Sequence, residues 1–444
     1  MSTGFIELND ASINQAIDGR LIDTSPGYAV LDGEKMLLGQ AGQQNARLLP
    51  RWTNNRFWNQ LNSDPIANST RSIRHHADLA FGHLEEIWAR MISHLDQNEN
   101  QSIDHVVLAV PGFYDRQQLG LLLGMAKESQ IPVSSLVDLG LISVAKQSNL
   151  PTTLYLDISL HRISLTHLTS NGLLRAVKTL IISDSGLHTL WDRWANIVAK
   201  QFIQTSRYDP MHQADSEQRL FDLLPSWIRK GDKSGPFEID LHGVKHSTQV
   251  SNEQLLTACS TFYPDIVKAI RTTMLSNDGA TLFLSHRFLG FPGLVRSLQL
   301  IPNLEVEQLN ETAAIDAAYA NWDKLVSSNG SVSHVTTLPV SGKKTIARFV
   351  HQSPTHLLLG NRAYAIKGSL RIESFNNSDS ETGDLKESAE NARCTLYKRG
   401  KDIFLEAHSA EVQINGTSVT GQTSLSPGDR ITIENQSAVL ITAN

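Results

Sequence analysis

The sequence predicts a mixed α/β domain followed by a smaller all-β domain. Short apolar runs such as HVVLAV (105–110) alternate with amphipathic stretches over residues 1–326, which is typical of an α/β fold. A polar segment, SSNGSVSH, interrupts this order and indicates a linker, which we place at residues 327–339. Beyond the linker the helical periodicity disappears, and short strands separated by Gly, Asn and Asp fill residues 340–444.

The predicted elements of the first domain follow one another in a regular order. The segment GFIELND (4–10) contains a strand, and YAVLDGEKMLLGQ (28–40) is a hairpin that turns at Asp32-Gly33. Apolar residues recur at helical spacing from Leu79 to Leu95. The remaining predicted elements are a strand at 105–111, a helix at 115–131, a strand and helix at 134–148, a hairpin at 152–170, a strand at 173–183, long helices at 187–204 and 254–275, and a strand at 281–285.

Composition narrows the range of functions. The chain of 444 residues has a net charge of -6, which argues against an extended nucleic-acid-binding surface. Its two cysteines form neither a disulfide framework nor a metal-binding spacing. The N-terminus lacks the features of a secretory signal, and the apolar runs are too short to span a membrane. We therefore expect a cytoplasmic protein without a membrane span.

The order of the segments resembles a known domain. The best match is HVVLAVPGFYDRQQLGLLLGMAKESQIPVSSLVDLGLISVA (105–145), followed by DSGLHTLWDRWANIVAKQF (184–202) and LFLSHRFLGFPGLVRSLQ (282–299). These segments resemble the nucleotide-binding domain of the seventy-kilodalton heat-shock chaperones, in the actin/sugar-kinase superfamily. The resemblance implies a two-lobed actin-like domain over residues 1–326, built from ribonuclease-H-like repeats that hold ATP and magnesium between them.

The residues at the nucleotide corners differ from the pattern of that family. Family members use aspartates for the metal-water shell and glycines that let backbone N–H groups approach phosphate. The resemblance places the vestigial nucleotide positions of this chain at Asn9, Asp10, Asp157, Ser159, Gly186 and Ser285. Glu7 and Asn9 replace the Asp and a Gly of the first turn, while Ser159, Leu160 and His161 replace the glycines of the second. Ser285 and His286 take the glycine positions of the adenosine motif.

These substitutions predict a domain without ATPase activity. Leu160 and His161 would fill the space of the phosphates, and phosphoryl transfer depends on positioning and charge stabilisation. We therefore expect no catalytic residue, no metal and no cofactor, with nucleotide binding without turnover and a divergent ATPase as alternatives. We expect His161 and Arg162 to be solvent-facing turn residues, with a phosphate contact as the alternative. The peptide-binding domain of the chaperones has no counterpart in this sequence.

The C-terminal segment resembles a second family. Its strands and turns at AEVQINGTSVTG (410–421) and LSPGDRITI (425–433) resemble the second half of a forkhead-associated domain. That resemblance implies a β-sandwich over residues 340–444, with phosphothreonine contacts at Arg362, Arg393 and Asn415. Glu390 stands where the family has a phosphate-binding Ser, and a carboxylate repels phosphate. We therefore favour a protein-docking role over phosphopeptide binding, which remains the alternative.

Together these features predict a non-catalytic scaffold or adaptor whose partners are other proteins. A divergent ATPase, a phosphothreonine-binding module and a residual chaperone are the alternatives. The segment RWTNNRFW (51–58) combines arginines with Trp52, Phe57 and Trp58. Exposed aromatic side chains in such a segment would mark a partner surface.

Overall fold

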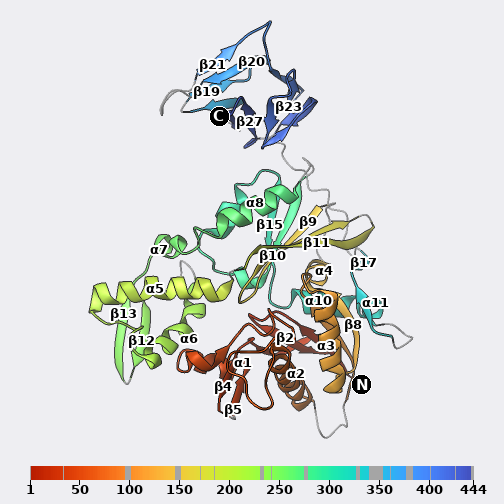
Figure 1. Cartoon of the computed structure of the whole chain (residues 1–444), viewed down its shortest axis with the longest axis vertical. Coiled ribbons are helices and arrows are strands. Elements are labelled where there is room, and N and C mark those ends of the chain that lie inside the picture. Colours follow the sequence, from red (N-terminus) through yellow and green to blue (C-terminus); the bar gives the residue numbers. More distant parts are fainter. Residues whose placement is uncertain are drawn as a thin grey trace. The chain divides into compact units, whose positions relative to one another are not determined.

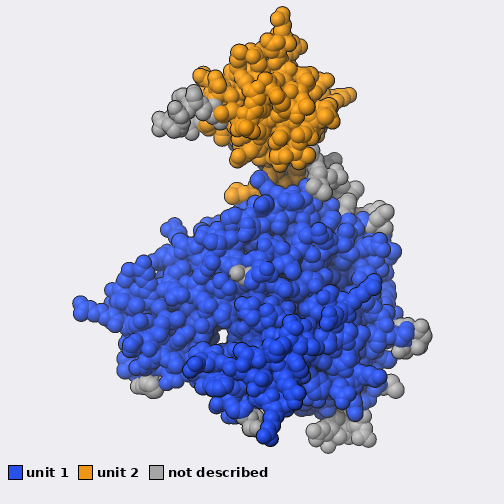
Figure 2. Space-filling view, in the orientation of Figure 1, with its two compact units in different colours: residues 1–275, 280–299, 304–347 blue, residues 276–279, 300–303, 348–444 orange. Residues whose placement is uncertain are grey.

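The computed structural model divides the chain into two compact units (Figure 2). Unit 1 comprises residues 1–275, 280–299 and 304–347, and unit 2 comprises residues 276–279, 300–303 and 348–444. The structure describes residues 2–33, 35–95, 102–145, 152–170, 172–184, 186–230, 235–241, 243–274, 279–326, 331–339, 354–360, 362–376, 384–400, 402–425 and 427–441.

Unit 1, whose elements are labelled in Figure 1, contains two six-stranded sheets in which five strands follow the same order. The first has the order β16-β8-β7-β1-β2-β3 and the second the order β15-β14-β9-β10-β11-β17. In each sheet three consecutive strands form an antiparallel meander, and two later strands add in parallel beside its first strand. The paired equivalents are β1 (Ser2–Glu7) and β9 (Thr152–Ile158), β2 (Ile13–Ile17) and β10 (Ile163–Ser170), β3 (Arg20–Ser25) and β11 (Leu173–Ser183), β7 (Ile103–Val110) and β14 (Ala280–Leu284), and β8 (Val133–Asp138) and β15 (Leu304–Gln308).

Helices cover the faces of both sheets and fill the space between them. Helices α2 (His76–Ser93) and α3 (Arg116–Glu128) pack on the first sheet, and α8 (Tyr263–Thr273) and α9 (Leu294–Gln299) pack on the second. Helices α4 (Leu139–Val144) and α10 (Ala313–Ala320) contact each other and share one buried core with strands of both sheets. The duplicated order thus brings the β1–β2 and β9–β10 turns to corresponding places in the two halves.

Local sequence explains the main elements. The predicted strand at 105–111 is confirmed as β7, whose apolar run is buried because a parallel strand is covered on both faces. The predicted hairpin is confirmed as β4 (Ala29–Asp32) and β5 (Lys35–Leu38), with Gly33 at a φ of 62° in its turn. Helix α2 buries Leu84, Ile87 and Met91 at helical spacing, as expected for an amphipathic helix.

The remaining described elements of unit 1 lie around these sheets. They are α1 (Gly39–Asn45), the 3-10 helix η1 (Pro50–Trp52), β6 (Thr53–Asn54), α5 (Leu187–Ser206), α6 (Ala214–Lys230), β12 (Phe237–Leu241), β13 (Val244–Thr248), α7 (Asn252–Thr257), the 3-10 helix η4 (His286–Phe288) and α11 (Trp322–Leu325).

The segment 327–339 differs from the predicted linker. Two short strands, β16 (Ser333–Val335) and β17 (Thr337–Pro339), pair with β8 and β11. Leu338 is buried, so residues 333–339 belong to the packed body of unit 1. The polar residues of the segment are typical of a linker, but a strand can pair with a sheet edge through its backbone without an apolar sequence. Residues 327–330 lie outside the described residues.

Unit 2 is formed by antiparallel strands, as the sequence predicts. Its sheets have the orders β19-β18-β28-β27-β24-β25 and β21-β20-β22-β23-β26. Buried residues from both sheets, including Leu357, Ile431, Ile372 and Leu405, form one core. The strands are β18 (His356–Leu359), β19 (Arg362–Ala365), β20 (Ser369–Asn376), β21 (Asp384–Glu387), β22 (Cys394–Arg399), β23 (Asp402–Ala407), β24 (Val412–Ile414), β25 (Thr417–Ser418), β26 (Gly421–Leu425), β27 (Arg430–Ile433) and β28 (Gln436–Ile441).

Neither unit provides a membrane-spanning helix within the part of the chain that the structure describes.

Candidate functional site

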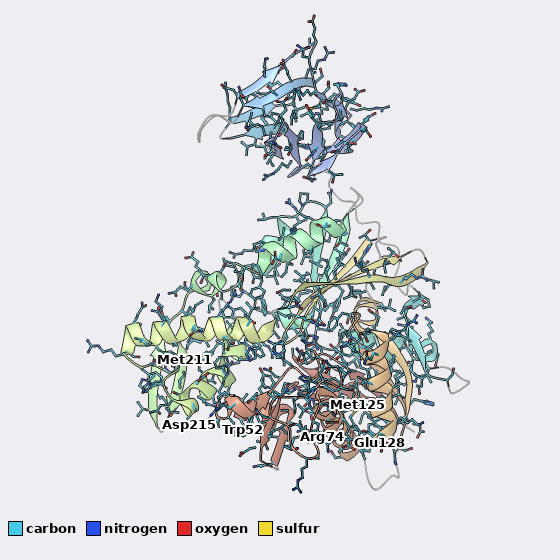
Figure 3. The ribbon with its side chains drawn as sticks, in the orientation of Figure 1. Trp52, Arg74, Met125, Glu128, Met211 and Asp215 are labelled. Atoms are coloured by element: carbon cyan, nitrogen blue, oxygen red, sulfur yellow. The ribbon has the colours of Figure 1, made fainter. Side chains whose placement is uncertain are left out.

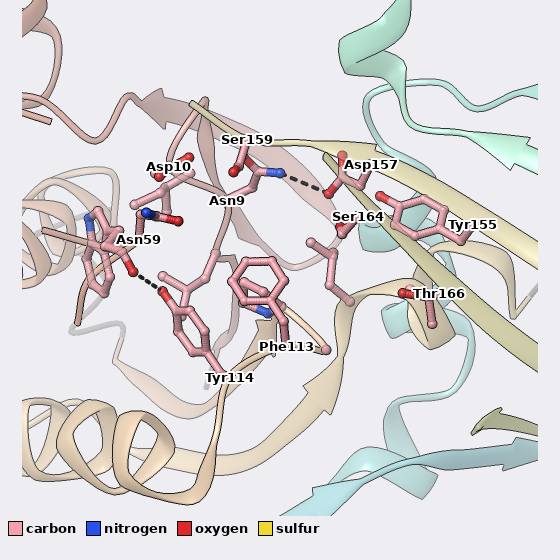
Figure 4. A pocket seen from close by; sticks show the side chains of 17 residues that line it. Asn9, Asp10, Asn59, Phe113, Tyr114, Tyr155, Asp157, Ser159, Ser164 and Thr166 are labelled. Carbon is pink, nitrogen blue, oxygen red and sulfur yellow. Dashed lines mark hydrogen bonds between the residues drawn. The ribbon is translucent and has the colours of Figure 1, made fainter. Parts of the chain in front are cut away.

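The two equivalent hairpin turns of unit 1 contact each other, and Figure 4 shows Asn9 and Asp10 of the first turn beside Asp157 and Ser159 of the second. Glu7 pairs with Asn14 across the first hairpin, and Asp157 pairs with Ser164 across the second. The same number of residues separates each pair, so Glu7 and Asp157 occupy equivalent positions. The duplication therefore places two carboxylates at the point where the turns approach each other.

A third corner places Arg287 between these carboxylates. Strand β14 ends at Leu284, and the 3-10 helix η4 then carries Arg287 inward. Its Nη2 atom donates to Glu7 Oε1 at 2.8 Å, and Nη1 lies 3.5 Å from Asp157 Oδ1. The side chains of Arg287, Glu7 and Asp157 are only 3%, 3% and 8% exposed. A buried guanidinium thus joins the two halves of the duplicated domain.

The charges of this cluster depend on one another. Burial alone would lower the pKa of Arg287, but the neighbouring Glu7 and Asp157 raise it, so the guanidinium remains charged. Burial raises the pKa of Glu7, and the charge and hydrogen bond of Arg287 oppose that shift. Removal of Arg287 would leave both carboxylates buried without a cation.

Side chains already bind backbone N–H groups in both turns. The Asp10 carboxylate accepts from the Leu160 N–H at 2.7 Å, and Asn9 Oδ1 accepts from the Ala11 N–H at 3.0 Å. Asn9 Nδ2 also donates to Asp157 Oδ2 at 2.9 Å, and Figure 4 shows these two side chains pointing toward each other. A phosphate would have to displace these bonds before it reached the N–H groups of Leu160 and Ala11.

The second turn is packed inside the domain, which corrects the prediction of a solvent-facing His161. Leu160 is fully buried and packs near Tyr28 and Trp191. His161 is only 4% exposed, and its Nε2 atom lies 3.0 Å from the carbonyl oxygen of Asn55. Burial lowers the pKa of His161 to about 3, so its ring is neutral at physiological pH and supplies no charge for an anion.

Gly186 lies directly against this turn. A Cβ atom at Gly186 would overlap the carbonyl oxygen of Ser159 and the backbone nitrogen atoms of His161 and Arg162. The Leu187 N–H at the start of α5 donates to the Ser159 carbonyl at 2.9 Å. Glycine at 186 therefore permits close packing between the start of α5 and the second turn. Gly186, expected as a nucleotide position, here contacts backbone atoms of the protein.

Two pockets occur near the turns. The first, lined by Asn9, Asp10, Asp157 and Ser159, has a volume of about 30 Å³, which is room for roughly two water molecules. The second, lined partly by Trp191, Pro225, His286 and Phe291, has a volume of about 320 Å³. Small-molecule sites have volumes of roughly 300–1,000 Å³. Only the second pocket has the size of a ligand site, and it is lined by Arg287 rather than by the predicted phosphate positions.

Arg47 links three helices that each contribute residues to the lining of the larger pocket. It follows α1, and its guanidinium lies 2.5 Å from Asp192 of α5 and 3.4 Å from Glu217 of α6. The guanidinium carbon also lies 3.6 Å from the ring centre of Phe221. The Arg47 N–H donates to Gln218 Oε1 at 2.8 Å. These contacts fasten α1 to the α5–α6 pair.

The predicted phosphothreonine residues of unit 2 are engaged in local contacts. The Arg393 guanidinium forms ion pairs with Glu411 and Glu434. Arg362 pairs with Asp384 at 3.0 Å. Asn415 Nδ2 donates to Asp429 at 2.9 Å, so its side chain stabilises the turn in which it lies. The two arginines are thus neutralised by carboxylates, although Asn415 does form the tight turn that the sequence predicts, with a φ of 52°.

Sequence reasoning located the three corners but missed the contact that joins them. The structure brings Asn9, Asp10, Asp157, Ser159 and Gly186 together, and Ser285 lies beside Arg287 through its side chain. The role of Arg287 was not predicted. A signal did exist, because Arg287 closely follows the apolar run LFL (282–284) of a buried strand, where a charged side chain is buried only if it is paired. Among the described residues no three His, Cys, Asp or Glu side chains are grouped as a metal site requires.

The chain matches no family model, and a search of curated proteins finds no relative.

Proposed function

We propose that the chain is a non-catalytic scaffold or adaptor, in which a two-lobed actin-like domain has lost nucleotide chemistry and serves to bind other proteins. The duplicated sheet order supports the actin-like part of this proposal. Each half of unit 1 has an antiparallel meander with two parallel strands added beside it, and the halves meet at equivalent turns.

The observation that carries the proposal is the position of Arg287. In an actin-like ATPase the two equivalent acidic residues face a hydrated metal ion. Here Glu7 and Asp157 face a guanidinium that the chain itself supplies. A metal ion at the same place would be repelled by Arg287, so the residues present do not fit a magnesium-nucleotide complex.

The hydrogen bonds of Asp10 and Asn9 support the same conclusion. They occupy the backbone N–H groups of Leu160 and Ala11, and the cavity between the turns is large enough only for water. Neither turn is free to cradle a triphosphate. A cytoplasmic location and partners of protein type belong to the same proposal.

Isothermal titration calorimetry with ATP and magnesium tests the nucleotide part. We expect no binding heat and no release of phosphate from ATP, with an actin-fold ATPase as the positive control. Micromolar ATP binding with turnover would overturn the proposal and favour a divergent ATPase. If ATP binds without turnover, a change of its affinity in Trp191→Phe would assign the binding to the larger pocket, which Trp191 lines.

A further inference from the structure

Unit 1 carries a concentration of arginines in the segment 46–76. This segment contains five arginines and one aspartate, a net charge of +4, whereas the whole chain has a net charge of -6. Arg47 is engaged by Asp192 and Glu217. The other four, Arg51, Arg56, Arg71 and Arg74, are exposed.

Among the residues that the structure describes, these four arginines have no carboxylate partner. No ion pair joins any of them to an acidic side chain within the described ranges of the chain. Trp52 lies among them and is 43% exposed, although its neighbours Phe57 and Trp58 are buried in the core. The predicted aromatic surface of RWTNNRFW is thus reduced to one tryptophan.

Hydrogen bonds to backbone carbonyl groups fold this segment back on itself. Asn68 donates to the carbonyl oxygen of Arg51, which brings these two parts of the segment together. The Ile66 N–H donates to the Arg74 carbonyl at 2.9 Å, and Arg74 Nε donates to the Arg71 carbonyl at 3.3 Å. Figure 3 shows Trp52 and Arg74 along the same edge of unit 1. We call Arg51, Trp52, Arg71 and Arg74 the arginine patch.

We propose that the arginine patch binds an acidic segment of a partner protein. This inference rests on the proposed scaffold function and adds the chemistry of the partner. Unpaired arginines are complementary to Glu and Asp side chains, which they bind through two parallel hydrogen bonds. Arginine and tryptophan are also among the residues that are enriched at the positions contributing most to binding energy in protein interfaces.

The charge of the rest of the chain favours an acidic peptide over nucleic acid. Residues outside the segment carry a net charge of -10, because the segment contributes +4 to a total of -6. This net negative charge opposes the binding of a long polyanion such as RNA, whereas a short acidic segment needs to contact the patch alone. Salt should weaken the binding, since the contacts are exposed charges.

Fluorescence anisotropy with the full chain tests this proposal. The probe is a fluorescein-labelled peptide of twelve residues made of glutamate and tyrosine, and the control peptide has glutamine in place of glutamate. We expect the acidic peptide to bind and the glutamine peptide not to bind. The variant Arg51→Glu/Arg74→Glu should lose about tenfold in affinity or more. Trp52→Ala should weaken binding without changing its salt dependence.

A matched variant shows whether the effect is local. Arg271→Glu/Arg296→Glu changes the net charge equally at two exposed positions on α8 and α9, and it should bind like the wild type. Equal losses in both double variants, or equal binding of both peptides, would overturn the proposal. Tighter binding of a single-stranded oligonucleotide than of the acidic peptide would also overturn it and assign the patch to nucleic acid. None of these results changes the calorimetry with ATP, so the two proposals fail independently.

Discussion

Glu7 and Asp157 occupy the same position in the two hairpins of unit 1 and face the same guanidinium, that of Arg287. The two carboxylates come from different sheets, so the cluster connects the halves of the domain through charge. This cation is a side chain of the protein itself, so it does not have to be taken up from solvent. The halves are therefore joined in the absence of any ligand.

Replacement of Arg287 should destabilise unit 1 strongly. Arg287→Met leaves Glu7 and Asp157 buried without a cation, which should lower the free energy of unfolding by about 3–5 kcal/mol. Urea unfolding followed by tryptophan fluorescence measures this change, since all seven tryptophans belong to unit 1. Arg296→Met, at an exposed position of α9, is the control and should change stability by less than about 0.5 kcal/mol.

A neutral version of the cluster separates charge from packing. The triple variant Glu7→Gln/Asp157→Asn/Arg287→Met removes every charge of the cluster and should recover most of the stability that Arg287→Met loses. If the triple variant is no more stable than the single one, the cluster contributes through shape rather than charge. In that case the interpretation of Arg287 as an internal cation is incorrect.

Asp10 should make unit 1 less stable as the pH rises. Burial raises the pKa of Asp10 from 3.8 to about 6, so the folded state holds a proton that the unfolded state has released. Stability is then highest below pH 4 for this group and falls until the pH exceeds 6. From pH 5 to pH 7.5 the loss should be about 1 kcal/mol.

The variant Asp10→Asn should lack this loss. Its Oδ1 atom can still accept the Leu160 N–H, so the variant should gain about 1 kcal/mol relative to the wild type between pH 5 and pH 7.5. Buried histidines such as His161, whose pKa is lowered, make the folded state less stable in acid. Their contribution is the same in both proteins, so it cancels in the difference between Asp10→Asn and the wild type. Asp32→Asn at an exposed hairpin turn serves as the control. A constant difference between Asp10→Asn and wild type would contradict the prediction.

Two glycine-to-alanine variants should act in opposite directions. Gly186→Ala places a Cβ against the backbone of Ser159 and His161, and the overlap should cost about 2–3 kcal/mol. Gly120→Ala lies within α3, where no atom would contact the added Cβ, so higher helix propensity should stabilise by about 1 kcal/mol. Thermal unfolding of both variants provides the measurement. A neutral Gly186→Ala would mean that the α5 start can move away from the turn.

Much of the fold can be predicted from the sequence, because the periodicity of apolar residues indicates which side chains are buried. The apolar run of β7 and the stripe of α2 needed no tertiary information. The strands β16 and β17 could not be predicted from the sequence. They are short polar segments that form strands by pairing with β8 and β11. Local propensity cannot reveal a strand that exists through its partner.

Only part of the candidate site could be predicted from the sequence. Segment order placed the turns of Asn9 and Ser159 together, and the structure agrees. The ion pair between Arg287 and Glu7 joins residues that lie far apart in the chain, so no local pattern contains it. The burial of His161 was missed for a similar reason. His161 is buried because it packs against His188 and Asn55, which lie far from it in the sequence. The turn-like sequence around His161 does not indicate these contacts.

Unit 2 should not distinguish phosphorylated from unphosphorylated threonine peptides. Arg393 is paired with Glu411 and Glu434, and a phosphate would have to displace both carboxylates while it is repelled by them. Binding of matched peptides, with and without the phosphate, measures this preference for the wild type and for Arg362→Ala and Arg393→Ala.

The same pairing predicts how phosphate affinity could be created. Glu411→Gln/Glu434→Gln removes both competing charges and leaves the Arg393 guanidinium free to bind an anion. This variant should bind the phosphorylated peptide more tightly than the wild type does, and the gain should disappear when Arg393→Ala is added. A wild-type preference for phosphothreonine that Arg393→Ala abolishes would contradict this argument, because it would mean that the carboxylates leave Arg393 when a phosphopeptide arrives.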